Sequence, residues 1–129
     1  MRLMNKKILV AAALFGALAV ILGAFGAHGL RGNLTSSELE NWKTAVDYQF
    51  YHTLALLFLS RFSKVPNRTI SFAAIAFVVG IVLFSGSIYL LSTRSITGIN
   101  LPFLGPITPV GGVFLILGWI SMLLAILRK

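Results

Sequence analysis

Cysteine is absent from this chain of 129 residues, and acidic residues are scarce, with three Asp or Glu against 11 Lys or Arg. The lack of cysteine excludes disulfide bonds, thiolate metal sites and thiol nucleophiles. Charged residues make up 11% of the sequence and apolar residues 57%, whereas soluble domains average roughly 25% charged and 45–50% apolar. A domain of this size cannot hide so much apolar surface from water. The composition, with a mean hydropathy of +0.92, therefore predicts a membrane protein.

The net charge of +8 is distributed in a way that disfavours nucleic-acid binding. Basic residues occur singly or in short clusters between apolar runs. This spacing is typical of loops that lie at an anionic membrane surface. We therefore expect membrane lipid among the partners of the protein, and no nucleic acid.

Four apolar stretches have about the length of a transmembrane helix, which needs roughly 20 residues. The predicted spans cover residues 8–27, 45–62, 70–91 and 110–127. Pro102, Pro106 and Pro109 lie before the last span and are expected to keep that segment irregular. The sequence thus predicts one all-α domain over residues 1–129, a four-helix transmembrane bundle.

A short outer amphipathic helix is expected before the second span. Thr35 or Ser36 can cap its start, and Glu38 lies near the positive end of its dipole. Trp42 lies on its apolar stripe, and an indole suits the membrane–water boundary, where its N–H stays in contact with water. We expect this helix to lie along the outer surface and then turn into the second span.

Two alternatives to this topology stay open. Residues 1–27 resemble a signal peptide in having basic residues, an apolar core and small residues near its end, although the apolar run exceeds the usual 7–15 residues. The second span can instead be an interfacial helix. A three-span chain would place the two termini on opposite sides of the membrane, and the basic residues would then no longer lie on one side.

Basic residues are concentrated on one side of the four-span topology, and the other side has all three acidic residues. The basic residues on the first side are Arg2, Lys6, Lys7, Arg61, Lys64, Arg68, Arg128 and Lys129. Short loops rich in Lys and Arg stay in the cytoplasm. Both termini are therefore predicted to be cytoplasmic.

Small residues recur along three of the spans at helical spacing. They are Ala12, Gly16, Ala19, Gly23 and Gly26 in the first span, Ala73, Ala76, Gly80 and Ser87 in the third, and Gly111, Gly118, Ser121 and Ala125 in the fourth. Helices associate in lipid by close backbone approach, which small residues permit. We expect these stripes to be packing surfaces, with a ligand passage as the alternative.

Polar residues within a bilayer are costly and are candidates for function. On the predicted topology they converge from four stretches at the outer level of the bundle. The candidate ligand-binding or structural cluster consists of His28, Asp47, Tyr48, Gln49, His52, Ser85, Ser87, Tyr89, Thr108, Gly111 and Gly112.

The spacing within this cluster indicates what its members can do. Tyr48 and His52 are one helical turn apart and share a face. Asp47 can orient an imidazole or accept a hydrogen bond from Tyr51. The start of the last span offers unpaired N–H groups to a carboxylate or phosphate, such as a lipid headgroup.

The cluster is compatible with three functions of different classes. A binding or scaffold module would use His28, Tyr48 and His52 as a hydrogen-bonded core that positions a lipid, a small amphiphile or a partner helix. A small proton-coupled transporter, acting as an oligomer, would use an imidazole beside Asp47. Haem or metal bound between the two histidines lacks a third ligand or an attachment motif. The sequence has no nucleotide-binding loop or hydrolase motif, so we expect a non-enzymatic protein without cofactor or metal, with a possible homo-oligomer or partner membrane protein.

Four motifs resemble domain-of-unknown-function family 423, whose bacterial members are small inner-membrane proteins and whose animal relatives are called transmembrane protein 256. The motifs are Gly23–Leu30, Tyr48–Leu56, Phe84–Tyr89, and Thr108–Gly112 with Gly118 and Trp119. They follow one another in matching order over nearly the whole chain. The resemblance implies a four-helix integral protein of the bacterial cytoplasmic membrane, and it implies no reaction.

Overall fold

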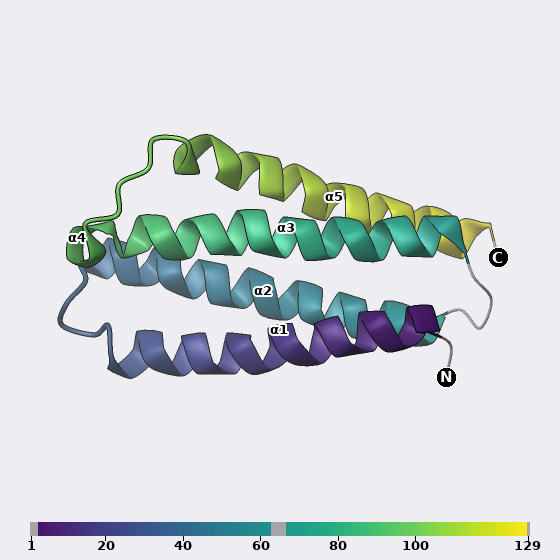
Figure 1. The fold of residues 1–129 in the computed structure, drawn as a ribbon, viewed down its shortest axis with the longest axis horizontal. Coiled ribbons are helices and arrows are strands. Elements are labelled where there is room, and N and C mark those ends of the chain that lie inside the picture. Colours follow the sequence, from purple (N-terminus) through teal and green to yellow (C-terminus); the bar gives the residue numbers. More distant parts are fainter. Residues whose placement is uncertain (1–2, 63–66, 129) are drawn as a thin grey trace.

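Four long helices and one short helix form the protein in a computed structural model that describes residues 3–62 and 67–128 (Figure 1). The helices are α1 (Leu3–His28), α2 (Ser36–Phe62), α3 (Arg68–Ser92), α4 (Arg94–Thr97) and α5 (Leu104–Leu127). The predicted all-α class is confirmed. Three of the basic residues used to orient the chain, Arg2, Lys64 and Lys129, lie outside the described residues.

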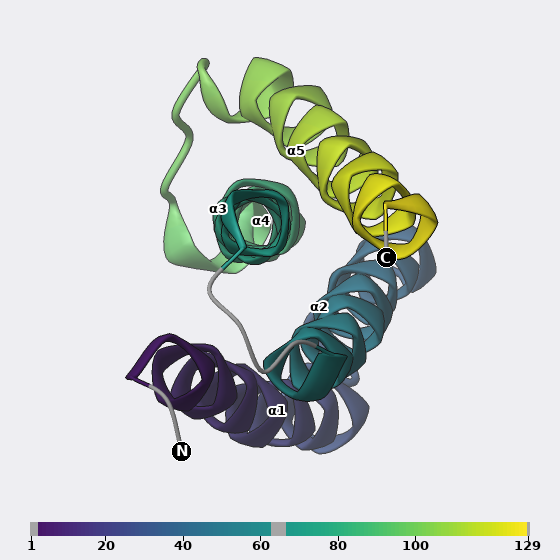
Figure 2. The same ribbon diagram turned by 90° about the vertical axis from the view of Figure 1, so that its right-hand side faces the viewer.

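The long helices are antiparallel neighbours in the order of the sequence. α1 packs on α2, α2 on α3, and α3 on α5. Figure 1 shows α1 and α5 at opposite edges of the molecule, and Figure 2, which looks along α3, shows α1 and α5 on opposite sides of α3. The beginning of α1 and the end of α5 lie at the same end of the molecule, opposite the turn between α1 and α2.

Three of the described helices, α1, α3 and α5, are long and apolar enough to cross a membrane. α2 has a similar length of 27 residues, which corresponds to about 40 Å. Its first turns contain Glu38, Glu40 and Lys43, and these charges lower the mean hydropathy of the helix. The described chain is therefore an all-helical protein with three clearly apolar long helices.

Residues 36–47 are the first turns of α2 and do not form a separate surface helix. The backbone N–H of Glu38 donates to Thr35 Oγ1 at 3.2 Å, and the N–H of Thr35 donates to Glu38 Oε2 at 2.9 Å. This reciprocal pair is a capping box, which confirms the expected helix start. No glycine or proline occurs between residues 36 and 62, so the helix continues without a break. The prediction of a short outer helix that turns into a second one is wrong in this respect.

Trp42 is buried against α1, and only 6% of its surface is exposed. Its indole Nε1–H donates to the carbonyl of Leu22 at 2.9 Å. A side chain at Gly26 would prevent this contact, because a Cβ atom there would lie 2.5 Å from Nε1. The expectation of an indole N–H in contact with water is wrong, since a backbone carbonyl of α1 replaces the water.

The small residues of α1 form a packing surface, as predicted, and the helix that they face is α2. A Cβ atom added at Gly16 would meet the side chain of Thr53 at 3.4 Å, and one at Gly23 would meet Val46 at 3.3 Å. The stripe therefore lets the two helices approach closely along most of their length.

The small residues of α3 and α5 serve the contact between these two helices. A Cβ atom at Gly80 would lie 2.5 Å from Leu115, and one at Gly118 would lie 2.6 Å from the ring of Phe77. At Gly111 the backbone of α3 itself comes into contact, at Phe84. The packing interpretation of the small-residue stripes is confirmed for all three helices.

α5 begins at Leu104, which is six residues before the predicted start of the last span. Pro106 lies in the first turn, where a backbone N–H has no partner within the helix. Pro109 lies inside the helix and removes one further hydrogen bond. The expectation that prolines keep the whole segment before residue 110 irregular is therefore wrong.

We expect Gly111→Ala to destabilise the protein by about 1–3 kcal/mol, because its methyl group would overlap the backbone of α3. Gly86→Ala is the matched control, since a Cβ atom at Gly86 would meet nothing within 4 Å. Thermal unfolding in detergent, followed by circular dichroism, measures both variants. Equal melting temperatures for the two variants would contradict the proposed close contact.

Candidate functional site

Gln49 connects three helices through its side-chain amide. It lies on α2 and is 3% exposed. Its Nε2 donates to the carbonyl of Phe15 in α1 at 2.8 Å, and its Oε1 accepts a hydrogen bond of 2.7 Å from the hydroxyl of Tyr89 in α3. A buried amide must find partners inside the protein. Both polar atoms of this side chain thus bond to other helices.

Two serines extend the hydrogen-bond network on α3. Ser85 Oγ donates to the carbonyl of Ala45 in α2 at 2.7 Å. Ser87 Oγ shares a hydrogen bond of 2.6 Å with Thr108 Oγ1 in α5. Both serines are buried, so these bonds join α3 to its neighbours on either side. They fit the structural alternative that the sequence offers for the polar cluster.

His52 uses both nitrogens of its ring. The indole Nε1–H of Trp119, in α5, donates to Nε2 of His52 at 3.0 Å. Nε2 is therefore the acceptor, which assigns the hydrogen to Nδ1, and Nδ1 donates to the carbonyl of Tyr48 at 2.6 Å. Trp119 and the carbonyl of Tyr48 thus orient the imidazole and set its tautomer.

Aromatic rings surround this imidazole. The ring of Phe77 lies 5.5 Å from that of His52, and the ring of Trp119 lies 5.3 Å from Phe77. The ring of Tyr48 stacks at 6.0 Å from His52 and also lies 4.8 Å from Phe84. Tyr48 is 40% exposed, so its ring covers one side of the histidine and is itself partly open to the surroundings of the protein.

His28 is not part of this network, although it was expected to join Tyr48 and His52. It is the last residue of α1 and is exposed. The partner of Thr53 on α1 is Gly16, and His28 lies twelve residues further along the helix, which corresponds to about 18 Å. The hydrogen-bonded core of three residues is therefore wrong, and the two histidines are too far apart to hold one haem or metal between them.

Asp47 is bonded to Lys43 and does not orient the imidazole. Lys43 Nζ donates to Asp47 Oδ2 at 3.0 Å. The hydrogen bond and the negative charge of Asp47 raise the pKa of Lys43 above its usual value, so the amine is charged at neutral pH. The expected pairing of Asp47 with His52 or Tyr51 is replaced by this ion pair one turn back along α2.

Gly111 and Gly112 do not form an anion site at a helix start. Because α5 begins at Leu104, both glycines lie inside the helix, where backbone N–H groups bond to carbonyls of the preceding turn. Gly111 instead contacts the backbone of α3, and Gly112 lies beside the ring of Phe84. Their role in the structure is close packing.

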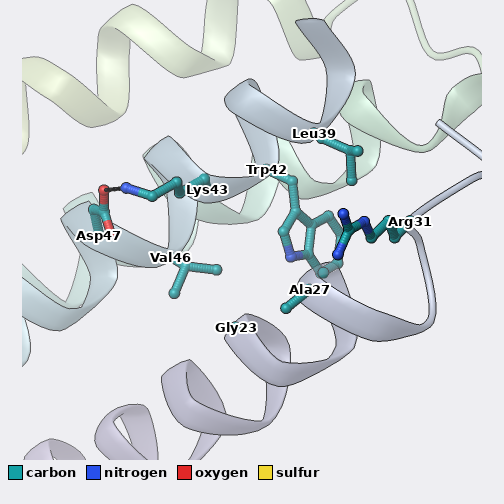
Figure 3. A pocket seen from close by; sticks show the side chains of 9 residues that line it. Gly23, Ala27, Arg31, Leu39, Trp42, Lys43, Val46 and Asp47 are labelled. Carbon is teal, nitrogen blue, oxygen red and sulfur yellow. Dashed lines mark hydrogen bonds and ion pairs between the residues drawn. The ribbon is translucent and has the colours of Figure 1, made fainter. Parts of the chain in front are cut away.

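A pocket of about 500 Å³ lies between the end of α1 and the start of α2 (Figure 3). Its apolar surface comes from small residues of α1 and from larger side chains of α2. Its lining residues are Gly23, Gly26, Ala27, Arg31, Leu39, Trp42, Lys43, Val46 and Asp47. We call it the α1–α2 groove. Of the predicted cluster, only Asp47 lines it.

Sequence reasoning missed the α1–α2 groove and the part played by Trp42, Trp119 and Arg31. A signal for the groove is present, since small residues at positions 23 and 27 precede a basic turn and an apolar stripe. That signal becomes informative only when α2 is known to start at residue 36 and to pack along α1.

A family model and individual relatives of known sequence both match this chain. The model described as "Protein of unknown function (DUF423)" matches residues 22–112. A UPF0382 membrane protein of Staphylococcus aureus is 41% identical over 93% of this chain and 94% of its own length. UPF0382 membrane protein YwdK of Bacillus subtilis is 39% identical over 95% of this chain and 98% of its own length. No solved structure matches.

We expect Gln49→Leu to lower the free energy of unfolding by about 1–3 kcal/mol, because the Tyr89 hydroxyl would lose its buried acceptor. Thr53→Val is the matched control on the same helix, since Thr53 Oγ1 donates only within α2, to the carbonyl of Gln49. Unfolding in mixed detergent micelles compares the two variants. The network would have no role in holding the helices together if Gln49→Leu cost no more than Thr53→Val.

Proposed function

The chain belongs to the DUF423 family, and we propose that it is a four-span protein of the bacterial cytoplasmic membrane that binds a lipid or small amphiphile without catalysing a reaction. The observation that carries the binding proposal is the α1–α2 groove, which is apolar inside and charged at its rim. Such pockets, with a few placed polar groups, are typical of ligand sites.

The packing of α2 supports its role as the fourth span. α2 lies antiparallel between α1 and α3, which are both apolar enough to cross a membrane (Figure 1). Because α2 leads from the end of α1 to the start of α3, it has to cross the same layer as they do. Its later turns also expose large apolar side chains, such as Tyr51, Leu54 and Phe58, which suit contact with lipid.

The charge distribution supports a cytoplasmic location for both termini. Lys6 and Lys7 lie near the start of α1, Arg68 starts α3 and Arg128 follows α5. These positions share one end of the molecule (Figure 1). Short segments rich in Lys and Arg are retained in the cytoplasm.

The absence of cysteine from the sequence allows a direct test of this orientation. We expect a single cysteine at Asn33, in the exposed turn after α1, to react with a membrane-impermeant maleimide added to intact cells. A single cysteine at Arg128 is expected to react only after the cells are permeabilised. The opposite labelling pattern would contradict the orientation, and labelling of both sites in intact cells would contradict the four-span topology.

The hydrogen-bond network supports a scaffold role for most of the predicted polar cluster. Gln49, Ser85 and Ser87 direct their side chains to groups in other helices. The cluster therefore holds the helices in place, and ligand binding falls to the neighbouring groove, whose walls these helices position.

The bonds of His52 give no support to proton-coupled transport. Nε2 accepts the indole N–H of Trp119, and Nδ1 donates to the carbonyl of Tyr48. A second proton on the ring would place two N–H groups against each other. A proton relay through this histidine would first have to break its contact with α5.

We expect Ala27→Phe to lower lipid retention about tenfold, because the phenyl ring would occupy the α1–α2 groove. Ala24→Phe is the matched control, since Ala24 is also exposed on α1 but does not line the groove. Native mass spectrometry in mild detergent reports the lipid bound to each variant and the number of copies of the chain. Equal lipid retention by both variants would contradict the binding proposal, and a second protein chain displaced by Ala27→Phe would show that the groove holds a partner helix instead.

A further inference from the structure

We propose that the α1–α2 groove selects an anionic phospholipid and that Arg31 binds the phosphate of its headgroup. This inference rests on the proposed function, which requires only that a lipid or amphiphile occupies the groove. It adds the charge of the ligand and the residue that recognises it.

Within the part of the chain that the structure describes, Arg31 has no carboxylate partner. The sequence has three acidic residues in all. Asp47 is paired with Lys43, as the dashed line in Figure 3 shows. The carboxylate of Glu38 accepts the N–H of Thr35 at the start of α2, and Glu40 does not line the groove. The rim therefore has one uncompensated positive charge, on the guanidinium of Arg31.

A guanidinium suits this ligand better than other cations do. Its planar group of N–H donors matches two oxygens of one phosphate and stays charged at any physiological pH. A zwitterionic lipid would bring its own ammonium group close to Arg31, whereas an anionic lipid has no such group. The free charge at the rim therefore favours a headgroup with a net negative charge.

The depth of Arg31 agrees with a phosphate ligand. α1 has 26 residues and is about 39 Å long, which exceeds the roughly 30 Å thickness of the hydrocarbon layer. Arg31 follows the end of α1 by three residues, so it lies at the level of the headgroups in the four-span topology. The groove extends from Arg31 toward Gly23 (Figure 3), which is the direction of the membrane interior.

The apolar wall of the groove is already formed without a ligand. Trp42 is held by its hydrogen bond to Leu22, and its ring lies 4.6 Å from Tyr89 and 6.1 Å from Phe25. On the facing helix, Gly23 and Ala27 leave the space into which an acyl chain can enter. A preformed wall favours binding, because less conformational freedom is lost on association.

The test uses the full-length chain, stripped of lipid in detergent and titrated with phosphatidylglycerol or phosphatidylcholine of identical acyl chains. Native mass spectrometry gives the apparent Kd of each lipid. We expect the wild type to bind phosphatidylglycerol about tenfold more tightly than phosphatidylcholine, as loss of one charge-assisted contact implies. Arg31→Gln should remove this preference, chiefly by weakening phosphatidylglycerol binding, because in phosphatidylcholine the ammonium group already offsets the attraction between Arg31 and the phosphate.

Arg94→Gln is the matched control, because Arg94 is exposed in α4 on the same side of the molecule but does not line the groove. It should keep the preference of the wild type. The melting temperature of Arg31→Gln should equal that of the wild type, since no carboxylate among residues 3–62 and 67–128 pairs with this side chain. A folding defect would therefore be visible separately from a loss of binding.

Three results would overturn the inference. Equal binding of both lipids by the wild type, with Ala27→Phe still weakening both, would disprove charge selection but leave the proposed function standing. Lipid binding unaffected by Ala27→Phe would remove both proposals. Displacement of phosphatidylglycerol by inorganic phosphate at equal concentration would show that the site binds the free anion and not the lipid.

Discussion

The side-chain amide of Gln49 determines how three long helices sit against one another. In lipid there is no water to satisfy a polar side chain, so its donor and acceptor must find partners within the protein. The amide meets the carbonyl of Phe15 on one side and the hydroxyl of Tyr89 on the other. If α1 or α3 slid or rotated relative to α2, the amide of Gln49 would lose one of its two partners. These hydrogen bonds therefore favour one register of α1, α2 and α3.

Glycine makes such short bonds possible. Gly26 lets the indole of Trp42 reach a carbonyl of α1, and Gly118 makes room for Phe77, which packs beside His52. Close approach and polar bonding therefore depend on each other in this protein. Each small residue avoids a steric clash between two helices. Each hydrogen bond then holds the helices at the short distance that the small residue allows.

Features that depend on local sequence were predictable, and features that depend on which helices meet were not. The small-residue stripes, the cap at Thr35 and the all-α class follow from spacing and composition. The prediction of where α5 starts is wrong because Pro106 costs little in the first turn and the helix also continues through Pro109. The groove beside Arg31 depends on the position of α2 along α1, which a single sequence does not specify. The ion pair of Asp47 with Lys43 is local, because the two residues are four apart on α2, and this spacing could have predicted it.

The main-chain acceptors on α1 have a consequence for how this helix can change through evolution. The bonds from Gln49 and Trp42 end on carbonyl oxygens of residues 15 and 22. Every amino acid supplies a carbonyl oxygen, so substitutions at these two positions leave both acceptors in place. Close packing of α2 requires small residues at positions 16, 23 and 26 of α1. Sequence drift on α1 is therefore constrained by side-chain volume far more than by side-chain chemistry.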